Sequence, residues 1–290
     1  MTAKVLDGKA VAAQVLRDVA TKVGARVAAG KPRPKLAAVL IGDDAASATY
    51  VRIKQKDARE AGIDSQDHRL PTTTTTEQLL ELIGALNADE SVSGILVQQP
   101  APRQIDITRI VIAVDPMKDV DGFHPFNAGL VAMGIAGGVE PCTPAGIIEL
   151  LEKGGVTIDG ANAVVVGRSN IVGKPTAQLL LRRNATVTLC HTHTRGLADH
   201  TRAADILIAA AGKPNLITRE MVKPGAAVVD VGQNRTEAGL VGDVDAGAAE
   251  VAAFLTPVPG GVGPMTVAML LQNTVRAARY GLRMLAFPGG

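Results

Sequence analysis

Short apolar segments alternate with amphipathic segments along nearly the whole chain, and this alternation limits the possible folds more than any other feature. Six segments are short, β-branched and almost continuously apolar, as are strands that helices cover on both faces of a parallel sheet. These segments are 35–41, 93–98, 162–167, 185–190, 205–210 and 226–231. Amphipathic helices are expected over 9–29, 44–61, 76–87, 143–153 and 173–183. Strands that alternate with helices predict an α/β fold with parallel sheets.

The alternation stops between residues 115 and 142, where the chain is rich in Gly and Pro and has weak periodicity. We interpret this stretch as a long connection between two α/β units, and connections of that length often line sites. Because 290 residues suffice for two ordinary domains, we expect a first domain over 1–141 and a second over 142–264. An apolar helix is expected to return to the first domain, which then also includes 265–290.

Two segments carry helix-capping signals. Thr143 is the expected N-cap of the helix that opens the second domain, with Pro144 in its first turn. The threonine run at 72–76 is interpreted as a solvated loop that ends in a helix cap.

Composition excludes several functional classes. The 30 Lys and Arg nearly balance the 28 Asp and Glu, and no Trp is present, so a nucleic-acid binder is not expected. Two Cys form neither a disulfide framework nor a cysteine-rich zinc site, which favours a reducing compartment. Lys4, Asp7 and Lys9 interrupt the apolar run that a signal peptide needs, and no apolar run reaches the ~18 residues of a membrane span. We therefore expect a cytoplasmic protein without a membrane partner.

A glycine-rich turn follows the strand at 162–167 and leads directly into a helix. Gly167 permits the tight turn, Gly173 permits close backbone approach, and the helix N-terminus offers N–H groups to a diphosphate. Because the spacing of these glycines differs from the common G-x-G-x-x-G pattern, an ordinary strand-to-helix turn stays open as the alternative.

The next predicted strand indicates which dinucleotide would bind. It ends in Cys190-His191-Thr192-His193-Thr194-Arg195, without the carboxylate that would hold the ribose hydroxyls of NAD. Hydroxyls, imidazoles and Arg195, with Arg168 from the first turn, suit a 2′-phosphate and favour NADP. A metal site at His191 and His193 is the weaker alternative because no third ligand lies nearby in the sequence, so we expect no metal.

The first half holds three candidates for chemistry. Tyr50 and Lys54 share one face of a predicted helix, where a desolvated Lys can act as a base, although a solvated Lys is the open alternative. Gln98 follows a strand and could position a Lys or a substrate carbonyl. Asp121, before Gly122, is a ligand candidate, whereas a solvated, turn-forming role suffices for Asp115 and Asp119.

Five motifs occur in an order that resembles the bifunctional methylenetetrahydrofolate dehydrogenase/methenyltetrahydrofolate cyclohydrolase family. They are Tyr50-Val51-x-x-Lys54-x-Lys56, Gln98-x-Pro100, Asp119-Val120-Asp121-Gly122, Gly167-Arg168-Ser169-x-x-Val172-Gly173-x-Pro175 and the PVPGGVGPMT segment from Pro257 to Thr266. The resemblance covers essentially the whole chain, and the segments KDVDG and PVPGGVGPMT are far more specific than a Rossmann pattern.

The resemblance implies NADP-dependent oxidation of 5,10-methylenetetrahydrofolate, then hydrolysis of the methenyl product to 10-formyltetrahydrofolate. It also implies two α/β domains with a folate-binding cleft between them, the second a Rossmann-like doubly wound sheet that binds NADP, and a homodimer. One-carbon metabolism for purine, histidine and methionine biosynthesis is the implied context. By match to the motifs, Lys54 would be the key catalytic group, and burial is expected to keep it neutral beside the methenyl cation.

The remaining implied roles follow the same motifs. Tyr50 would stack on the aminobenzoyl ring, Gln98 would orient Lys54, and Asp121 would hold the pterin. Pro259, Gly260 and Gly261 would contact the substrate. The implied NADP-binding residues are Gly167, Arg168, Ser169, Thr192 and Gln233.

Two segments depart from the family pattern. His191-Thr192-His193-Thr194 stands where His-Ser-Arg/Lys-Thr is expected, which predicts a weaker contact with the 2′-phosphate. Gln233 stands where an apolar residue is expected near the nicotinamide.

Two other functions stay open: an NADP-linked dehydrogenase of two-domain α/β type that acts on shikimate-like hydroxy acids, and a non-catalytic protein that binds a nucleotide or folate.

Overall fold

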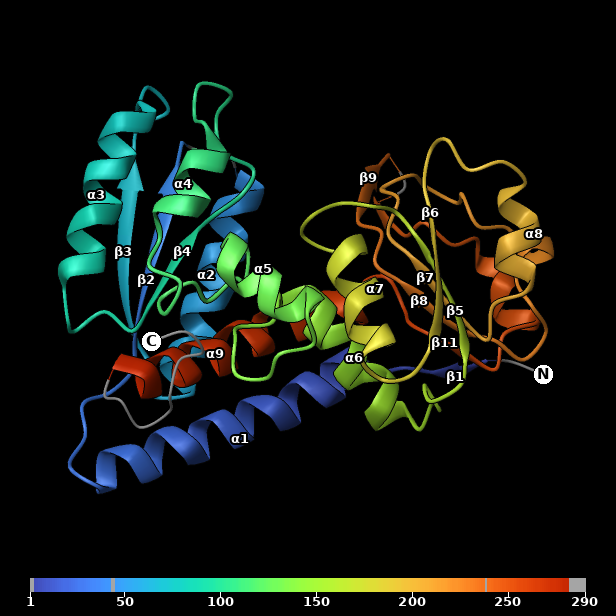
Figure 1. The fold of residues 1–290 in the computed structure, drawn as a ribbon, viewed down its shortest axis with the longest axis horizontal. Helices are drawn as coiled ribbons and strands as arrows, with labels where there is room; N and C mark the ends of the chain where they lie inside the picture. Colours follow the sequence, from blue (N-terminus) through green and yellow to red (C-terminus); the bar gives the residue numbers. More distant parts are fainter. Residues whose placement is uncertain (1–2, 43–44, 238, 282–290) are drawn as a thin grey trace. The chain divides into compact units, whose positions relative to one another are not determined.

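The computed structural model describes residues 3–42, 45–237 and 239–281, with the backbone alone for 45–50. The chain forms two compact units (Figure 1). One contains Gln14–Glu140 and the chain from Val267 onward; the other contains the chain up to Ala13 together with Pro141–Thr266. Within the described residues, no helix has the length and apolar character needed to cross a membrane.

The unit with Gln14–Glu140 is built on a parallel three-stranded sheet in the order β3-β2-β4. Its strands are β2 (Lys35–Ile41), β3 (Asp64–Leu70) and β4 (Gly94–Val97). β2 lies in the centre, and its residues from Leu36 to Ile41 are all buried, as the apolar run predicts. One face of the sheet packs against the apolar residues Leu79, Ile83, Leu86 and Ile110. They lie on α3 (Thr76–Ala88) and α4 (Ile107–Ala113).

Helix α2 (Ala45–Glu60) follows β2, as the sequence predicts. It ends at Glu60, and Gly62 just beyond it has a φ of 77°, which suits a left-handed helix terminus. There the Ile63 N–H donates to the Ala58 carbonyl at 2.8 Å, and the chain enters β3. β3 was not expected, because its sequence DSQDHRL is polar. It pairs with β2 alone, so as an edge strand it needs no apolar run.

The threonine run is only partly solvated. Thr75 caps α3 in a capping box with Gln78, which confirms the expected cap. Thr74 and Thr76 are buried, however, so a wholly solvated loop is wrong. The Thr76 hydroxyl donates to the Gln104 carbonyl and accepts from the Asp106 N–H, which explains its burial.

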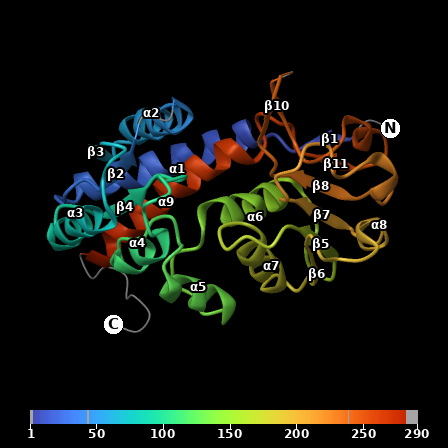
Figure 2. The same cartoon turned by 90° about the horizontal axis from the view of Figure 1, so that it is seen from above.

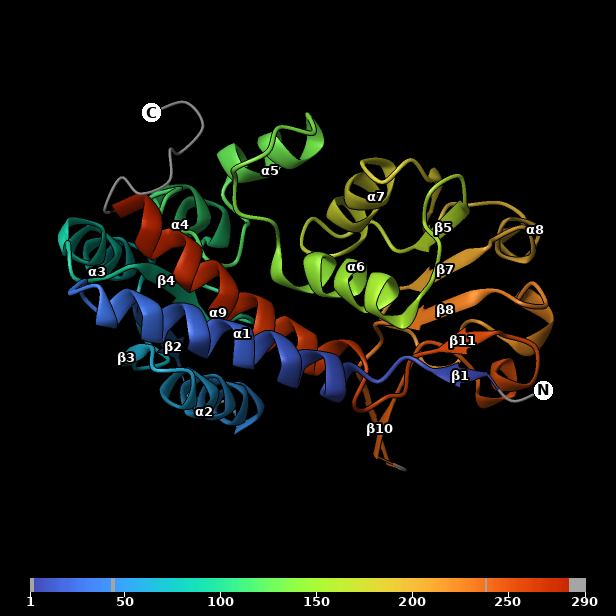
Figure 3. The same cartoon turned by 90° about the horizontal axis from the view of Figure 1, so that it is seen from below.

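The stretch interpreted as a long connection contains a helix, α5 (Pro125–Ala132). Pro125 starts the helix, and the His124 side chain caps it by accepting from the Phe126 N–H at 3.0 Å. The unit is completed by the later part of α1 (Gly8–Ala28) and of α9 (Val262–Gly281), which lie side by side (Figure 3). Arg26 of α1 donates to the Ala278 carbonyl of α9 at 3.2 Å.

The second unit is built on a parallel six-stranded sheet in the order β1-β11-β8-β7-β5-β6 (Figure 2). The four strands expected from the sequence are β5 (Asn162–Val166), β6 (Thr186–Cys190), β7 (Ile206–Ala209) and β8 (Ala227–Asp230). β5 pairs with β6 on one side and with β7 on the other. The strand order therefore reverses beside β5, as in a doubly wound sheet.

Two further strands extend this sheet beyond the sequence prediction. β1 (Lys4–Val5) pairs with β11 (Phe254–Leu255), which pairs with β8. Both have two residues, too few for a periodic pattern to reveal them. A small antiparallel hairpin joins β9 (Asn234–Thr236) to β10 (Gly239–Val241).

Helices α6 (Cys142–Gly154), α7 (Gly173–Leu181) and α8 (Leu197–Arg202) complete the second unit, with the short 3-10 helices η1 (Arg219–Met221) and η2 (Ala246–Glu250). The N-cap of α6 is Pro141, so the expected cap at Thr143 is wrong. Thr143 lies inside the first turn, and its hydroxyl lies 2.9 Å from that of Thr266 instead. Pro144 is in the first turn, as expected.

Candidate active site

Lys54 and Gln98 meet in the unit with Gln14–Glu140. Lys54 lies on α2 and Gln98 follows the last residue of β4. The Lys54 Nζ donates to the Gln98 Oε1 at 3.0 Å, and both residues are half-buried. The Gln98 Nε2 donates in turn to the Gln99 carbonyl at 2.5 Å, which leaves Oε1 directed at the lysine. A hydrogen-bonded, partly shielded amine of this kind can accept or donate a proton.

Tyr50 lies one helical turn before Lys54, in the backbone of α2. Its side chain lies outside the described residues, so stacking on an aminobenzoyl ring stays a prediction.

Asp121 is the acidic group near this pair. Burial raises the pKa of its carboxyl to about 7, while the Lys54 charge lowers it and the Asp119 charge raises it. The carboxyl is half-buried. The structure therefore places an amine, an amide and a carboxyl that titrates near neutrality in one region of the unit. Perturbed groups of this kind are typical of functional sites.

The interpretation of Asp119 as a solvated turn residue is wrong, because its side chain is buried. It is only 5% exposed, and its carboxylate accepts the N–H groups of Gly122, Phe123 and His124 as well as the Asn127 amide. The chain does turn here, as expected, but the backbone of the turn surrounds the Asp119 carboxylate. The sequence could not show this burial, because an Asp before a Gly turn is compatible with either environment.

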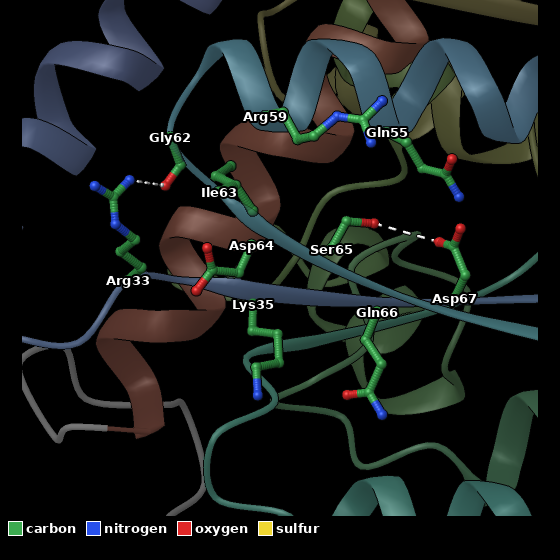
Figure 4. Close-up of a pocket in the computed structure, with 10 residues that line it drawn as sticks. All are labelled: Arg33, Lys35, Gln55, Arg59, Gly62, Ile63, Asp64, Ser65, Gln66 and Asp67. Carbon is green, nitrogen blue, oxygen red and sulfur yellow. Dashed lines mark hydrogen bonds between the residues drawn. The ribbon is translucent and has the colours of Figure 1, made fainter.

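The hollows of this unit differ greatly in size. A cavity of about 20 Å³, lined in part by Asp119, Asp121 and Phe123, has room for little more than a water molecule. A pocket of about 610 Å³ lies between α2 and β3, as Figure 4 shows. It is lined by Gln55 and Arg59 of α2, Asp64–Asp67 of β3 and the neighbouring residues Arg33, Lys35, Gly62 and Ile63. Of the predicted site residues whose side chains the structure describes, none lines it.

The glycine-rich turn lies at the strand-order reversal of the second unit. Gly167 follows β5 with a φ of 130°, and a Cβ there would lie 2.1 Å from the Ala210 carbonyl oxygen beyond β7. A Cβ on Gly173 would lie 1.9 Å from the Gly167 carbonyl oxygen. Both positions thus require glycine. Doubly wound sheets bind ligands at this position, at the carboxyl ends of the strands.

Ser169 and Arg168 occupy the same turn. The Ser169 hydroxyl accepts the N–H groups of Val172 and Gly173 at 3.1 and 3.3 Å, which fixes the entry into α7. Arg168 is exposed at the carboxyl end of β5. The turn can hold a diphosphate and offer a cation beside it.

The segment after β6 lies next to this turn. The Gly167 N–H donates to the Cys190 carbonyl at 2.9 Å, so the two segments share one edge of the sheet. His191 opens a turn, in which its N–H donates to the Thr194 hydroxyl at 2.8 Å. Thr192 is exposed at the tip. Among the residues described, no group of three His, Cys, Asp or Glu is placed to hold a metal ion.

Two buried carboxylates organise the neighbouring loops. Asp243 is fully buried and accepts the N–H groups of Ala211, Gly212 and Lys213 at 2.7–2.9 Å. Asp230 accepts from Gly232, Asp243 and Val244; burial raises its pKa to about 6, and the Asp243 charge adds to this rise. Asp243 was not predicted from the sequence. Its position after a Gly in GDVD was the available signal.

The predicted substrate segment Pro259–Gly261 belongs to the second unit. Gly260 has a φ of 111°, and its carbonyl accepts from the Lys9 N–H at 3.1 Å. A Cβ on Gly8 would lie 1.7 Å from the Gly261 carbonyl oxygen, so the start of α1 packs closely on this segment. Gln233 is exposed, and a Cβ on Gly263 would lie 3.0 Å from its Nε2.

Both units match models of one protein family. Residues 6–121 match the catalytic domain of tetrahydrofolate dehydrogenase/cyclohydrolase. Residues 141–282 match the NAD(P)-binding domain of the same family.

Individual relatives match nearly the full length. Bifunctional protein FolD of Halothermothrix orenii is 55% identical over 279 residues, which cover 96% of this chain and 98% of the relative. The crystal structure of the bifunctional FolD dehydrogenase/cyclohydrolase from Campylobacter jejuni has a TM-score of 0.93 and 46% identity, covering 96% of this chain and 99% of that one. The Trypanosoma brucei FolD structure, a complex with NADP cofactor and inhibitor, has a TM-score of 0.91 and 38% identity, covering 98% and 99%.

Shikimate dehydrogenase shares the fold alone. The Thermus thermophilus enzyme has a TM-score of 0.53 and 14% identity, covering 85% of this chain and 99% of that one. An identity this low gives no support to the alternative function, a dehydrogenase that acts on shikimate-like hydroxy acids.

Proposed function

We propose that this chain, which belongs to the tetrahydrofolate dehydrogenase/cyclohydrolase family, catalyses two consecutive reactions on one folate. The first is the NADP-dependent oxidation of 5,10-methylenetetrahydrofolate to 5,10-methenyltetrahydrofolate. The second is the hydrolysis of that cation to 10-formyltetrahydrofolate. The observation that carries the proposal is the hydrogen bond between Lys54 and Gln98, 3.0 Å long, with the Asp121 carboxyl near enough for the Lys54 charge to lower its pKa.

The glycine turn after β5 fits NADP. Gly167 and Gly173 allow a backbone approach that any Cβ would block, and Ser169 fixes the turn. Arg168 and Thr192, both exposed at adjacent strand ends, are assigned to the 2′-phosphate, and Gln233 to the nicotinamide end. Bound NADP⁺ supplies the hydride acceptor for the methylene carbon. We accordingly assign the unit with Pro141–Thr266 to NADP and the unit with Gln14–Glu140 to folate.

In the hydrolytic step, water adds to the methenyl carbon, and the Lys54 Nζ accepts the proton that the water loses. When the bond from this carbon to N5 breaks, N5 takes up the proton that the new hydroxyl gives up, and the formyl group stays on N10. Gln98 holds the lysine through Oε1 so that the nitrogen lone pair is directed at the water. Asp121 binds the pterin, Tyr50 stacks on the aminobenzoyl ring, and Pro259–Gly261 contact the substrate.

The variant Lys54→Met tests the assignment of the base. We expect cyclohydrolase turnover to disappear while folate still binds, because methionine keeps the length of the side chain but transfers no proton. Lys56→Met is the matched control, since Lys56 is exposed and pairs with Glu60 at 3.7 Å. Cyclohydrolase turnover in Lys54→Met close to that of Lys56→Met would remove the role of Lys54. Folate and NADP binding without any turnover in the unmodified chain would instead favour the non-catalytic binding protein.

The choice between NADP and NAD is a separate question. We propose NADP, because the segment after β6 contains Arg195 but no carboxylate for the ribose hydroxyls, and Arg168 follows the adjacent strand β5. Initial rates with NADP⁺ and NAD⁺ at equal concentrations test this. Replacing Arg168 with Ala should raise the KM for NADP⁺ and leave that for NAD⁺ nearly unchanged.

We also propose a homodimer in the cytoplasm that serves purine, histidine and methionine biosynthesis. The dimer is supported by the resemblance of the sequence to the family, and a reducing compartment by the two buried free thiols of Cys142 and Cys190. Sedimentation analysis tests the dimer, and cell fractionation tests the location.

A further inference from the structure

The carboxylate of Asp119 is at the centre of the turn that carries Asp121. Its Oδ1 accepts the N–H groups of Gly122 and Phe123 at 3.0 and 3.2 Å. Its Oδ2 accepts the His124 N–H and the Asn127 Nδ2, both at 2.8 Å. Burial raises the pKa of this carboxyl, and the hydrogen bonds from Asn127, His124 and Phe123 oppose that rise. The four donors together hold the turn in a single conformation.

This turn is tied to elements far away in the sequence. Asn127 is fully buried; its Nδ2 also donates to the Pro116 carbonyl, and its Oδ1 accepts the Val139 N–H, each at 3.0 Å. Asn273 of α9 donates to the carbonyls of Val120 and Glu140, also at 3.0 Å. Val120 and Gly122, on either side of Asp121, are therefore both held by hydrogen bonds, the first from Asn273 and the second to Asp119.

The preceding residue anchors the turn on its other side. The Lys118 Nζ donates to the carbonyls of Leu86, Asn87 and Asp89 at 2.7–3.0 Å, where α3 ends. A cation there satisfies terminal carbonyls and the helix dipole. The Lys118 carbonyl accepts from Ile95 of β4 at 2.8 Å, so the turn joins both the sheet and α3.

We propose that Asp119 is a positioning residue for the reaction: its carboxylate holds the backbone turn on which Asp121 lies. The proposal rests on the proposed function, because it assumes that Asp121 and Lys54 act on folate. The groups whose charges affect the pKa of Asp121 are Lys54 of α2 and Asp119 of its own turn, and the titratable group beside Asp119 is His124.

The pKa values agree with this geometry. Burial, the first cause, and then the Asp119 charge raise the pKa of Asp121 to about 7, against the opposing effect of Lys54. Loss of the Asp119 charge would remove a contribution that raises this pKa and leave that of Lys54, which lowers it, so the carboxyl would ionise at lower pH. Without this neighbour, Asp121 would be ionised more of the time at neutral pH.

The test compares Asp119→Asn with Asp115→Asn. Both remove one carboxylate charge from the same segment, but Asp115 accepts from the Met117 N–H at 2.8 Å and is not among the charges that act on Asp121. The Asp121 titration is followed by ¹³C NMR of protein labelled at the aspartate carboxyl carbons, with Asp121→Asn to assign the signal. The pH profile of cyclohydrolase kcat is measured on the same samples.

In Asp119→Asn we expect the Asp121 midpoint to fall below about 7 and the pH profile to move with it. We also expect kcat/KM to drop about 10- to 100-fold, as misplacement of a reacting group does. Asp115→Asn should leave both midpoints in place. A merely structural role for Asp119 would lower activity at every pH without moving the Asp121 midpoint, and this result would overturn the proposal.

A second variant covers the case in which Asp119→Asn does not fold. Asn127→Ser removes the amide that donates to Asp119 but keeps the Asp119 charge, so activity should fall while the Asp121 midpoint stays raised. Full activity in Asn127→Ser would contradict the positioning role. Absence of cyclohydrolase activity in the unmodified chain would refute the proposed function instead, while the NMR midpoints would still report on Asp119 and Asp121.

Discussion

Replacement of Asp121 with asparagine should stabilise the protein, and more so at high pH. The pKa of this carboxyl rises from 3.8 to about 7 on folding, chiefly because burial disfavours its charged form. The folded protein therefore binds this proton more tightly than the unfolded chain does. The free energy of unfolding must fall as pH rises from about 4 through about 7, and asparagine, which carries no charge, removes this loss.

The magnitude follows from the two pKa values. A shift from 3.8 to about 7 is worth about 4 kcal/mol once the pH exceeds the folded value, at about 1.4 kcal/mol per pH unit. Between about pH 5 and about pH 8, linkage assigns about 2.6 kcal/mol of this loss to Asp121. Solvent that reaches the half-buried carboxyl screens part of it, so we expect the advantage of Asp121→Asn to grow by about 2 kcal/mol over this range.

Urea unfolding of both proteins at each pH measures this difference, and other titrating groups largely cancel between them. Because two units can unfold separately, the transition should be followed by a probe within the unit with Gln14–Glu140. An advantage of Asp121→Asn that stays constant with pH, or shrinks as pH rises, would refute the assignment of a raised pKa to Asp121.

Three further predictions concern other parts of the chain. Gly173→Ala should abolish NADP binding in calorimetry and leave folate binding intact, because the new Cβ would lie 1.9 Å from the Gly167 carbonyl oxygen; unchanged NADP affinity would contradict it. Asp243→Asn should weaken NADP binding and lower Tm. The reason is that the new amide –NH₂ would face backbone N–H groups that now donate to the carboxylate. Calorimetry that finds neither effect would exclude this role. Thr75→Ala should cost about 1 kcal/mol of unfolding free energy in urea, because the capping box with Gln78 is lost, and should not change kcat.

The parallel sheets could be predicted from the sequence because their central strands are buried on both faces. β2 and the strands β5, β7 and β8 are almost continuously apolar, and each lies where its segment was expected. β3 could not be predicted, since an edge strand that reads DSQDHRL obeys no burial pattern. β1 and β11 pair over two residues each, and only the tertiary contact defines them.

The candidate site was predictable in residue type but not in geometry. Spacing placed Tyr50 and Lys54 on one helix face, and the strand end placed Gln98 near a ligand edge, but only the fold joins Lys54 to Gln98. The importance of Asp119 and Asp243 was missed because sequence does not show which of several Asp residues near turns is buried. The roles of Asp121 and of the NADP-binding residues stay predictions.

The central claim is that one chain carries both reactions, with Lys54 as the group on which hydrolysis depends. Its most direct test is a spectrophotometric time course with 5,10-methylenetetrahydrofolate and NADP⁺, run with the unmodified chain and with Lys54→Met. The account predicts that the unmodified chain forms NADPH and 10-formyltetrahydrofolate, whereas Lys54→Met forms no 10-formyltetrahydrofolate above the uncatalysed rate. Equal formation of 10-formyltetrahydrofolate by both proteins would contradict it.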